Sequence, residues 1–375
     1  MNDLAQFLDP VSTDIISGDI AYNDKQIGRI ADIYKTNFPE VSQADIILVG
    51  TDEARGAGYI SDNHPADVVR EQLYRLYLWH PDIKIADIGN IKNGNSLNDS
   101  YSCLRTILGD FAGTGKSVII IGGSHDNTLA QYSVYAESGK FAEATVIDAH
   151  IDLQSEAALK SESFLMEMLT SEPNFIRHYN HIGFQSYFVH PYMLETMDKL
   201  RFDVHRVGTA KEHLDEMEPV MRTSDFFSFD LGAVQYGAIP GSGVSPNGFT
   251  GEEACSLARF AGMAQKADSF GIYGYRPERD IDSITALQIS QMIWYFIDGK
   301  SRSRMESDFN DTFAFNEYHT SFAEGETTFL QSKKTNRWWM KMPGKKYIAC
   351  SYSDYLYASN NEIPERWLRV QEREG

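Results

Sequence analysis

The sequence predicts an α/β protein in which a mostly parallel sheet lies between two layers of helices. Short runs rich in β-branched residues, such as SVIIIGG at 117–123, alternate with longer amphipathic segments over the first 300 residues. Most of these runs are apolar throughout, which is typical of strands that are buried on both faces of a parallel sheet. Strands separated by helices favour the crossover connections of a three-layer fold.

The individual elements follow from the same pattern, in chain order. Eight strands are predicted, at residues 45–50, 84–88, 117–123, 144–148, 181–184, 203–208, 226–231 and 271–275. Five helices are predicted, at residues 65–78, 98–111, 191–200, 251–267 and 283–298. The first of these helices opens with Pro65, and proline is common at the first helical position. The fourth has Glu252 and Glu253 in its first turn, where the helix dipole favours acidic side chains.

The composition changes near residue 300. Residues 331–350 carry six basic residues and no acidic residue, and the segment before them is polar and aromatic. We therefore expect residues 1–304 to form the α/β domain. Residues 305–375 are expected to be a C-terminal extension that packs on the core or on a neighbouring subunit.

The charge and the residue usage exclude several functions. The chain has 34 Lys and Arg against 53 Asp and Glu, a formal net charge of −19. A nucleic-acid partner is therefore not expected, because phosphate binding needs a positive face, although Trp338 and Trp339 in the basic segment could stack on bases. No apolar run is long enough to cross a membrane. The start of the chain lacks the basic region of a signal peptide, and three scattered cysteines fit a reducing compartment, so we expect a cytoplasmic protein.

Three of the predicted strands end in residue types that bind metals. In a parallel sheet these carboxyl ends line the crevice where ligands bind. Positions 148, 150 and 152 alternate, so their side chains point the same way along an extended chain. Acidic residues at strand ends can instead cap helices, but three such ends together favour a metal site that suits Mn²⁺, Zn²⁺ or Fe²⁺. The candidate ligands are His125, Asp148, His150, Asp152 and Asp230.

The motifs that carry these residues, with their order, resemble those of the ureohydrolases, the arginase–agmatinase–formimidoylglutamase family. They read Gly-Gly-Ser-His at 122–125, Asp-Ala-His-Ile-Asp at 148–152 and Ser-Phe-Asp at 228–230. The family has Gly-Gly-Asp-His, Asp-Ala-His-x-Asp and Ser-x-Asp-x-Asp at three strand ends, and these bind two Mn²⁺. The resemblance runs from about residue 45 to about residue 300 and implies an arginase-like fold, with residues 1–304 as a metallohydrolase domain.

Two departures from the family pattern change the expected chemistry. Gly232 stands where the family has its sixth metal ligand, the second Asp of Ser-x-Asp-x-Asp. One metal position is then complete, whereas the other keeps only three protein ligands and has lost a negative charge. The resemblance therefore implies one tight Mn²⁺ rather than two, with Zn²⁺ or Fe²⁺ as alternatives. Gly274 stands where the family has a Glu that recognises a guanidinium, so true arginase activity is not expected.

The resemblance implies a hydrolase that acts on a C–N bond of a small linear amidine or amide, similar to formimidoylglutamase. A metal-activated water would be the nucleophile, and Asp152 would orient it. Asp126, Gln154 and Arg276 are candidate substrate-binding residues, although Arg276 could instead make a structural salt bridge. The alternative is a catalytically inactive protein of the same fold with a structural or interaction role. In either case we expect a homo-oligomer.

Overall fold

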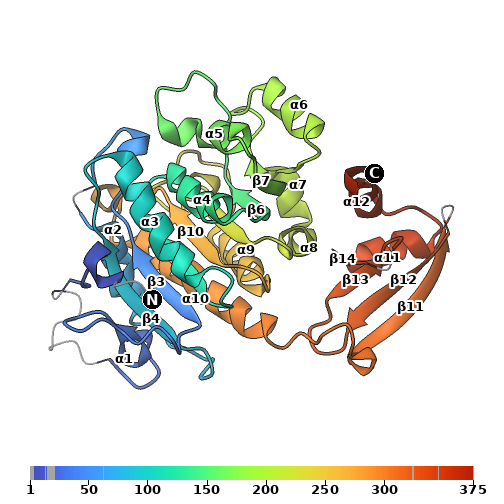
Figure 1. Ribbon diagram of the computed structural model, residues 1–375, viewed down its shortest axis with the longest axis horizontal. Coiled ribbons are helices and arrows are strands. Elements are labelled where there is room, and N and C mark those ends of the chain that lie inside the picture. The colour runs from blue at the N-terminus through green and yellow to red at the C-terminus, as the bar shows by residue number, and fades with distance from the viewer. Residues whose placement is uncertain are drawn as a thin grey trace.

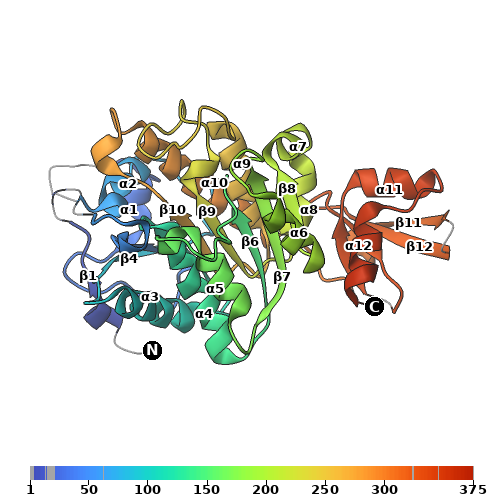
Figure 2. The ribbon, with the colours of Figure 1, turned by 90° about the horizontal axis from the view of Figure 1, so that it is seen from above.

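The computed structural model describes residues 4–12, 14, 22–61, 63–322, 325–344 and 346–374. Its centre is a ten-stranded sheet with helices on both faces (Figures 1 and 2). The strands are β1 (Leu8–Asp9), β2 (Asp32–Ile33), β3 (Ile46–Gly50), β4 (Ile85–Ile91), β5 (Ser117–Ile121), β6 (Ala142–Ile147), β7 (Ile176–Phe184), β8 (Asp203–Arg206), β9 (Phe226–Asp230) and β10 (Ser269–Tyr273). The helices are α1 (Ile27–Ile30), α2 (Pro65–Leu73), α3 (Leu97–Phe111), α4 (Thr128–Ser138), α5 (Phe164–Thr170), α6 (Pro191–Lys199), α7 (Val207–Glu212), α8 (Met217–Met221), α9 (Gly251–Met263) and α10 (Ile284–Ser303).

The order of the strands confirms the predicted fold class. The path across the sheet is β1-β4-β3-β5-β10-β9-β6-β7-β8, with β2 paired to β4. In the described part of the sheet every pairing is parallel except that of β1 with β4. The eight predicted strands correspond to β3 to β10, and the five predicted helices correspond to α2, α3, α6, α9 and α10.

The apolar strands divide their side chains between two cores, one on each face of the sheet. In β3, Ile46 and Leu48 join one core, whereas Ile47 and Val49 join the other. The strand β5 alternates in the same way, and every residue of both strands is buried. This alternation is why a strand without any polar residue is stable here, because each face of the sheet is covered by helices. Among the described residues, no helix combines the length and apolarity needed to cross a bilayer.

The C-terminal extension forms a second, smaller sheet beside the first (Figures 1 and 2). Its strands pair antiparallel in sequence order, and two helices follow them. The sequence pattern did not predict these strands, because aromatic side chains pack on both faces of the small sheet. Trp338 and Trp339 are neighbours in the chain, yet both are buried, in separate clusters. The elements are β11 (Phe315–Phe322), β12 (Gly325–Ser332), β13 (Trp338–Lys341), β14 (Tyr347–Cys350), α11 (Tyr352–Ser359) and α12 (Glu365–Glu374).

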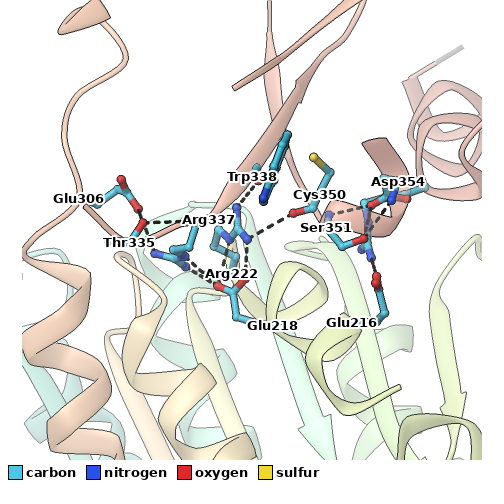
Figure 3. A network of polar contacts seen from close by, with 11 residues as sticks. Glu216, Glu218, Arg222, Glu306, Thr335, Arg337, Trp338, Cys350, Ser351 and Asp354 are labelled. Atoms are coloured by element: carbon cyan, nitrogen blue, oxygen red, sulfur yellow. Dashed lines mark hydrogen bonds and ion pairs between the residues drawn. The ribbon is translucent and has the colours of Figure 1, made fainter. Parts of the chain in front are cut away.

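A buried ion-pair network joins this extension to the edge of the larger domain. Figure 3 shows the guanidinium groups of Arg222 and Arg337 converging on the carboxylate of Glu218, at the start of α8. Arg337 donates to Glu218 Oε1 through Nε at 2.9 Å, and Arg222 Nη1 donates to the carbonyl of Trp338 at 2.6 Å. Burial opposes ionisation of Glu218, but the two arginines outweigh it and lower the pKa of Glu218 to about 2. The buried charges of Glu218, Arg222 and Arg337 therefore compensate one another.

Candidate metal centre

The candidate metal centre lies at the carboxyl ends of adjacent strands. β5, β10, β9 and β6 lie side by side, so the loops that follow β5 and β6 and the end of β9 meet at one edge of the sheet. The turn after β5 is tight: Gly122 and Gly123 have φ of 92° and 77°, in the left-handed region that favours glycine. A Cβ on Gly123 would lie 2.9 Å from the carbonyl of Glu53, so only glycine fits.

His125 faces three carboxylates in this crevice. Its Nδ1 lies 3.1 Å from Asp148 Oδ2, 3.0 Å from Asp152 Oδ2 and 3.8 Å from Asp230 Oδ2. His125, Asp148 and Asp152 are buried, and their donor atoms lie within 4.8 Å of one another. Donor atoms that share one metal ion at bonds of roughly 2.1 Å stand about 3.0–3.4 Å apart. The spacing around His125 Nδ1 therefore suits a shared divalent cation, with Asp230 at the edge of the group.

The charges of these residues favour a cation in the same place. Burial and the charge of Asp148 raise the pKa of Asp152 well above its usual range, and they raise the pKa of Asp230 to about 6. Burial also opposes ionisation of Asp148, but contact with His125 lowers the pKa of Asp148 to about 2. Burial disfavours the charged form of His125, whereas hydrogen bonds to Asp148 and Asp152 raise its pKa well above the usual value. One imidazolium cannot offset three carboxylates, so a divalent cation would replace the protons that they otherwise hold.

The residues that match a second metal position are less well placed. His150 Nδ1 lies 3.9 Å from Asp148 Oδ1, and its half-exposed ring stacks on Phe188 with the centroids 4.7 Å apart. Asp148 Oδ1 accepts a hydrogen bond from the His150 backbone at 3.2 Å. The Gly232 backbone donates to Asp230 Oδ1 at 2.6 Å, and a Cβ on Gly232 would lie 2.7 Å from that oxygen. Each of these two carboxylate oxygens therefore already accepts a backbone hydrogen bond.

The three candidate substrate-binding residues lie in different surroundings. Asp126 is fully buried and accepts a hydrogen bond from Tyr101, and it does not belong to the cluster of candidate ligands around His125. Gln154 is exposed, and its backbone N–H donates to the carbonyl of Glu162 at 3.2 Å. Arg276 is half-buried, and its guanidinium carbon lies 3.9 Å above the ring centroid of Tyr59.

Two supporting residues were not identified from the sequence. His181, inside β7, is buried, and its Nε2 lies 3.1 Å from the backbone carbonyl of Asp148. Burial lowers the pKa of His181 to about 4, so the ring is neutral near pH 7. The carbonyl of Glu53 accepts hydrogen bonds from Ser124 N at 2.9 Å and from Asn127 Nδ2 at 3.0 Å. The loop before Gly58 thus supports the His125 turn. The only sequence signal for His181 was a histidine at the start of a predicted strand.

Comparison with known proteins gives one family match and several structures of similar fold. A sequence profile of the Arginase family matches residues 44–298. The chain is similar to Trypanosoma cruzi formiminoglutamase crystallised with Mn²⁺ (TM-score 0.63, 16% identity, covering 70% of this chain and 95% of that chain). It is also similar to formimidoylglutamase from Bacillus subtilis (0.66, 13%, 76% and 95%) and to proclavaminate amidino hydrolase from Streptomyces clavuligerus (0.61, 18%, 75% and 98%). No curated protein matches the sequence.

Proposed function

The chain belongs to the arginase family, as its strand-end motifs predicted, and on that premise we propose that it is a metal-dependent hydrolase of C–N bonds in linear amidines or amides. The observation that carries this proposal is the position of His125 Nδ1, 3.0–3.1 Å from carboxylate oxygens of Asp148 and Asp152. A buried imidazole among buried acids suits a divalent cation and would be costly without one. The fold that it shares with formimidoylglutamases makes formimino compounds the first substrates to test.

The residues of the site have distinct roles in this proposal. His125, Asp148, Asp152 and Asp230 would hold the ion, with Mn²⁺ proposed and Zn²⁺ or Fe²⁺ compatible with the same donors. When bound, the ion supplies an acidified water and polarises the carbon under attack. Asp152 would accept a hydrogen bond from the attacking water, orient it, and take up its proton for delivery to the departing nitrogen as the C–N bond breaks. The backbone N–H of His150 donates a hydrogen bond to Asp148 Oδ1 and so orients the Asp148 carboxylate.

The same geometry favours one ion and disfavours guanidinium substrates. The second position has no carboxylate at Gly232, and a backbone N–H already binds Asp230 Oδ1. Gly274 has φ of 87°, and an ideal Cβ there would lie 3.3 Å from Asp230 Oδ2. Glycine supplies no carboxylate to clamp a guanidinium, and a glutamate at this position would be strained by the left-handed backbone.

An inactive protein with an interaction role is the second candidate. It is favoured by the glycines at 232 and 274 and by exposed aromatic residues in the C-terminal extension. Phe313 is 88% exposed there, and Tyr352, Leu356 and Tyr357 are exposed in the same extension. Such a protein would retain its fold and its oligomeric state without metal.

Turnover by the purified chain distinguishes these two functions. The chain is stripped of metal by chelation, reloaded with Mn²⁺, Zn²⁺ or Fe²⁺, and supplied with formimino, amide and guanidino compounds. We expect formimino compounds to release formamide and the free amine, and amides to release an amine and an acid, only after metal is restored. Asp152→Asn should abolish this release, whereas Asp215→Asn, the same change at an exposed site, should not. Absence of turnover with every metal and every compound would refute the hydrolase proposal.

A further inference from the structure

Arg276 emerges at the rim of the candidate metal centre. It follows β10, and β10 lies between the strands that lead to His125 and Asp230, with Tyr273 in register with Asp230. Gly274 comes next, hydrogen-bonded to the carbonyl of Gly123 at 2.9 Å, and it passes beside Asp230 without a side chain. Tyr275 turns into the core, where its hydroxyl donates to Asp280 at 2.8 Å. Arg276 is then the first side chain after β10 that reaches solvent beside the crevice.

Tyr59 holds this arginine by stacking on its face and by accepting a side-chain hydrogen bond, and the other N–H donors of the guanidinium stay available. The guanidinium carbon of Arg276 lies 3.9 Å above the ring centroid of Tyr59. Tyr59 follows the loop that supports the His125 turn, so this contact joins two loops around the crevice. Burial raises the pKa of the Tyr59 phenol, Arg276 opposes this rise, and the charge of Asp230 adds to it. Stacking uses the face of a guanidinium, whereas its N–H donors lie along the edge in a planar fork.

Among the described residues, Arg276 lacks the carboxylate partner that the buried arginines have. Arg70, Arg222 and Arg337 each make ion pairs with carboxylates. Within the described parts of the chain, Arg276 makes no ion pair, and its contacts, a stack on the ring and a side-chain hydrogen bond to the hydroxyl, are both with Tyr59. A half-buried guanidinium has five N–H donors, so the donors that do not serve Tyr59 can bind a carboxylate at little cost in ordering.

We propose that Arg276, held by Tyr59, binds a carboxylate of the substrate and makes the site selective for amidino or amido acids over analogues that lack an acid group. This inference rests on the proposed hydrolase function, because only an enzyme has a substrate. Binding of a carboxylate to Arg276 can nevertheless be measured without turnover. Tyr59 is a positioning residue here, because it acts on the substrate only through Arg276. The acidic ligands of the metal centre would otherwise repel such a substrate, so a cation at the rim has a clear electrostatic role.

Calorimetric binding of small probes tests the proposal. Glutarate and L-glutamate carry carboxylates, and 1,5-diaminopentane has a similar length without one. We expect the two acids to bind the wild-type chain and the diamine not to bind. Arg276→Ala should weaken binding of the acids by about 10- to 100-fold, the range for a charge-assisted hydrogen-bonded contact, and Arg276→Lys should weaken it less. Arg279→Ala, which removes the same charge from an exposed residue of the next turn, is the control and should bind as the wild type does.

Further titrations distinguish binding of the acids to Arg276 from their binding to a metal ion. Each titration is repeated on chelator-treated protein, because an acid that binds the ion rather than Arg276 would lose affinity there and not in Arg276→Ala. Tyr59→Phe keeps the aromatic face and should preserve binding, whereas Tyr59→Leu should weaken it. Equal affinity in wild type and Arg276→Ala, or no acid binding by a correctly folded wild-type chain, would overturn the inference. A chain that binds acids through Arg276 but hydrolyses nothing would refute only the proposed activity.

Discussion

Neutralising Glu218 should loosen the attachment of the C-terminal extension, and the structure gives the expected magnitude. Glu218 is buried between Arg222 and Arg337, and its pKa falls from 4.5 to about 2. A shift of that size corresponds to about 3 kcal/mol of interaction that the carboxylate makes only when the protein is folded. We therefore expect Glu218→Gln to lower the free energy of unfolding at pH 7 by about 3 kcal/mol, because two guanidinium groups lose their shared anion.

The pH dependence of this effect has a fixed sign. The folded pKa of Glu218 is lowered, so its contribution is fully present above about pH 4.5 and is lost as the pH falls towards 2. Denaturant unfolding followed by tryptophan fluorescence should show a large difference between wild type and Glu218→Gln at pH 7 and a small one near pH 2. Glu212→Gln, at an exposed position nearby, should change stability by less than about 0.5 kcal/mol. Equal stability of Glu218→Gln and wild type at pH 7 would refute the reasoning.

Three further outcomes follow from the site and the extension. Gly232→Asp should raise the bound Mn²⁺, measured by elemental analysis, from one towards two ions per chain. The backbone at Gly232 has no positive φ and accepts a side chain, provided that Asp230 Oδ1 moves aside. An unchanged Mn²⁺ content would contradict this. Urea should not be released from arginine or agmatine, and rates of roughly 1–10³ s⁻¹ would show that a guanidinium site exists after all. Deleting the residues after 305 should lower the melting temperature or change the oligomer size, and two unchanged values would argue against docking.

The central sheet was predictable from sequence because several of its strands, such as β3 and β5, are almost continuous apolar runs. The helix α4 was not, because Thr128 to Tyr132 are five consecutive buried residues and leave no helical period to detect. The small C-terminal sheet was hidden for a related reason, since Trp338 and Trp339 are buried on opposite faces of one strand. The spacing of apolar residues reveals a helix or a strand by its period only when the opposite face of that element is polar.

The approach of His125, Asp148 and Asp152 was also predictable, because the carboxyl ends of neighbouring parallel strands meet. The direction of Asp126 was not. It follows His125 on a short 3-10 turn, where successive side chains point about 120° apart, and it is buried against Tyr101. The left-handed φ of Gly274 and the stacking of Arg276 on Tyr59 depend on loops that are distant in sequence, so no local pattern could indicate them.

Metal content after Mn²⁺ loading and dialysis, together with proton release during titration, shows whether the cluster around His125 binds a divalent ion. We expect about one tightly held ion per chain, with protons released on binding because the pKa values of His125 and Asp152 are raised in its absence. Affinity should then weaken as the pH falls, and Asp148→Asn should remove the bound ion while Asp215→Asn keeps it. A chain that retains no metal under these conditions, or that retains it equally in Asp148→Asn, would contradict the assignment of this cluster as a metal centre.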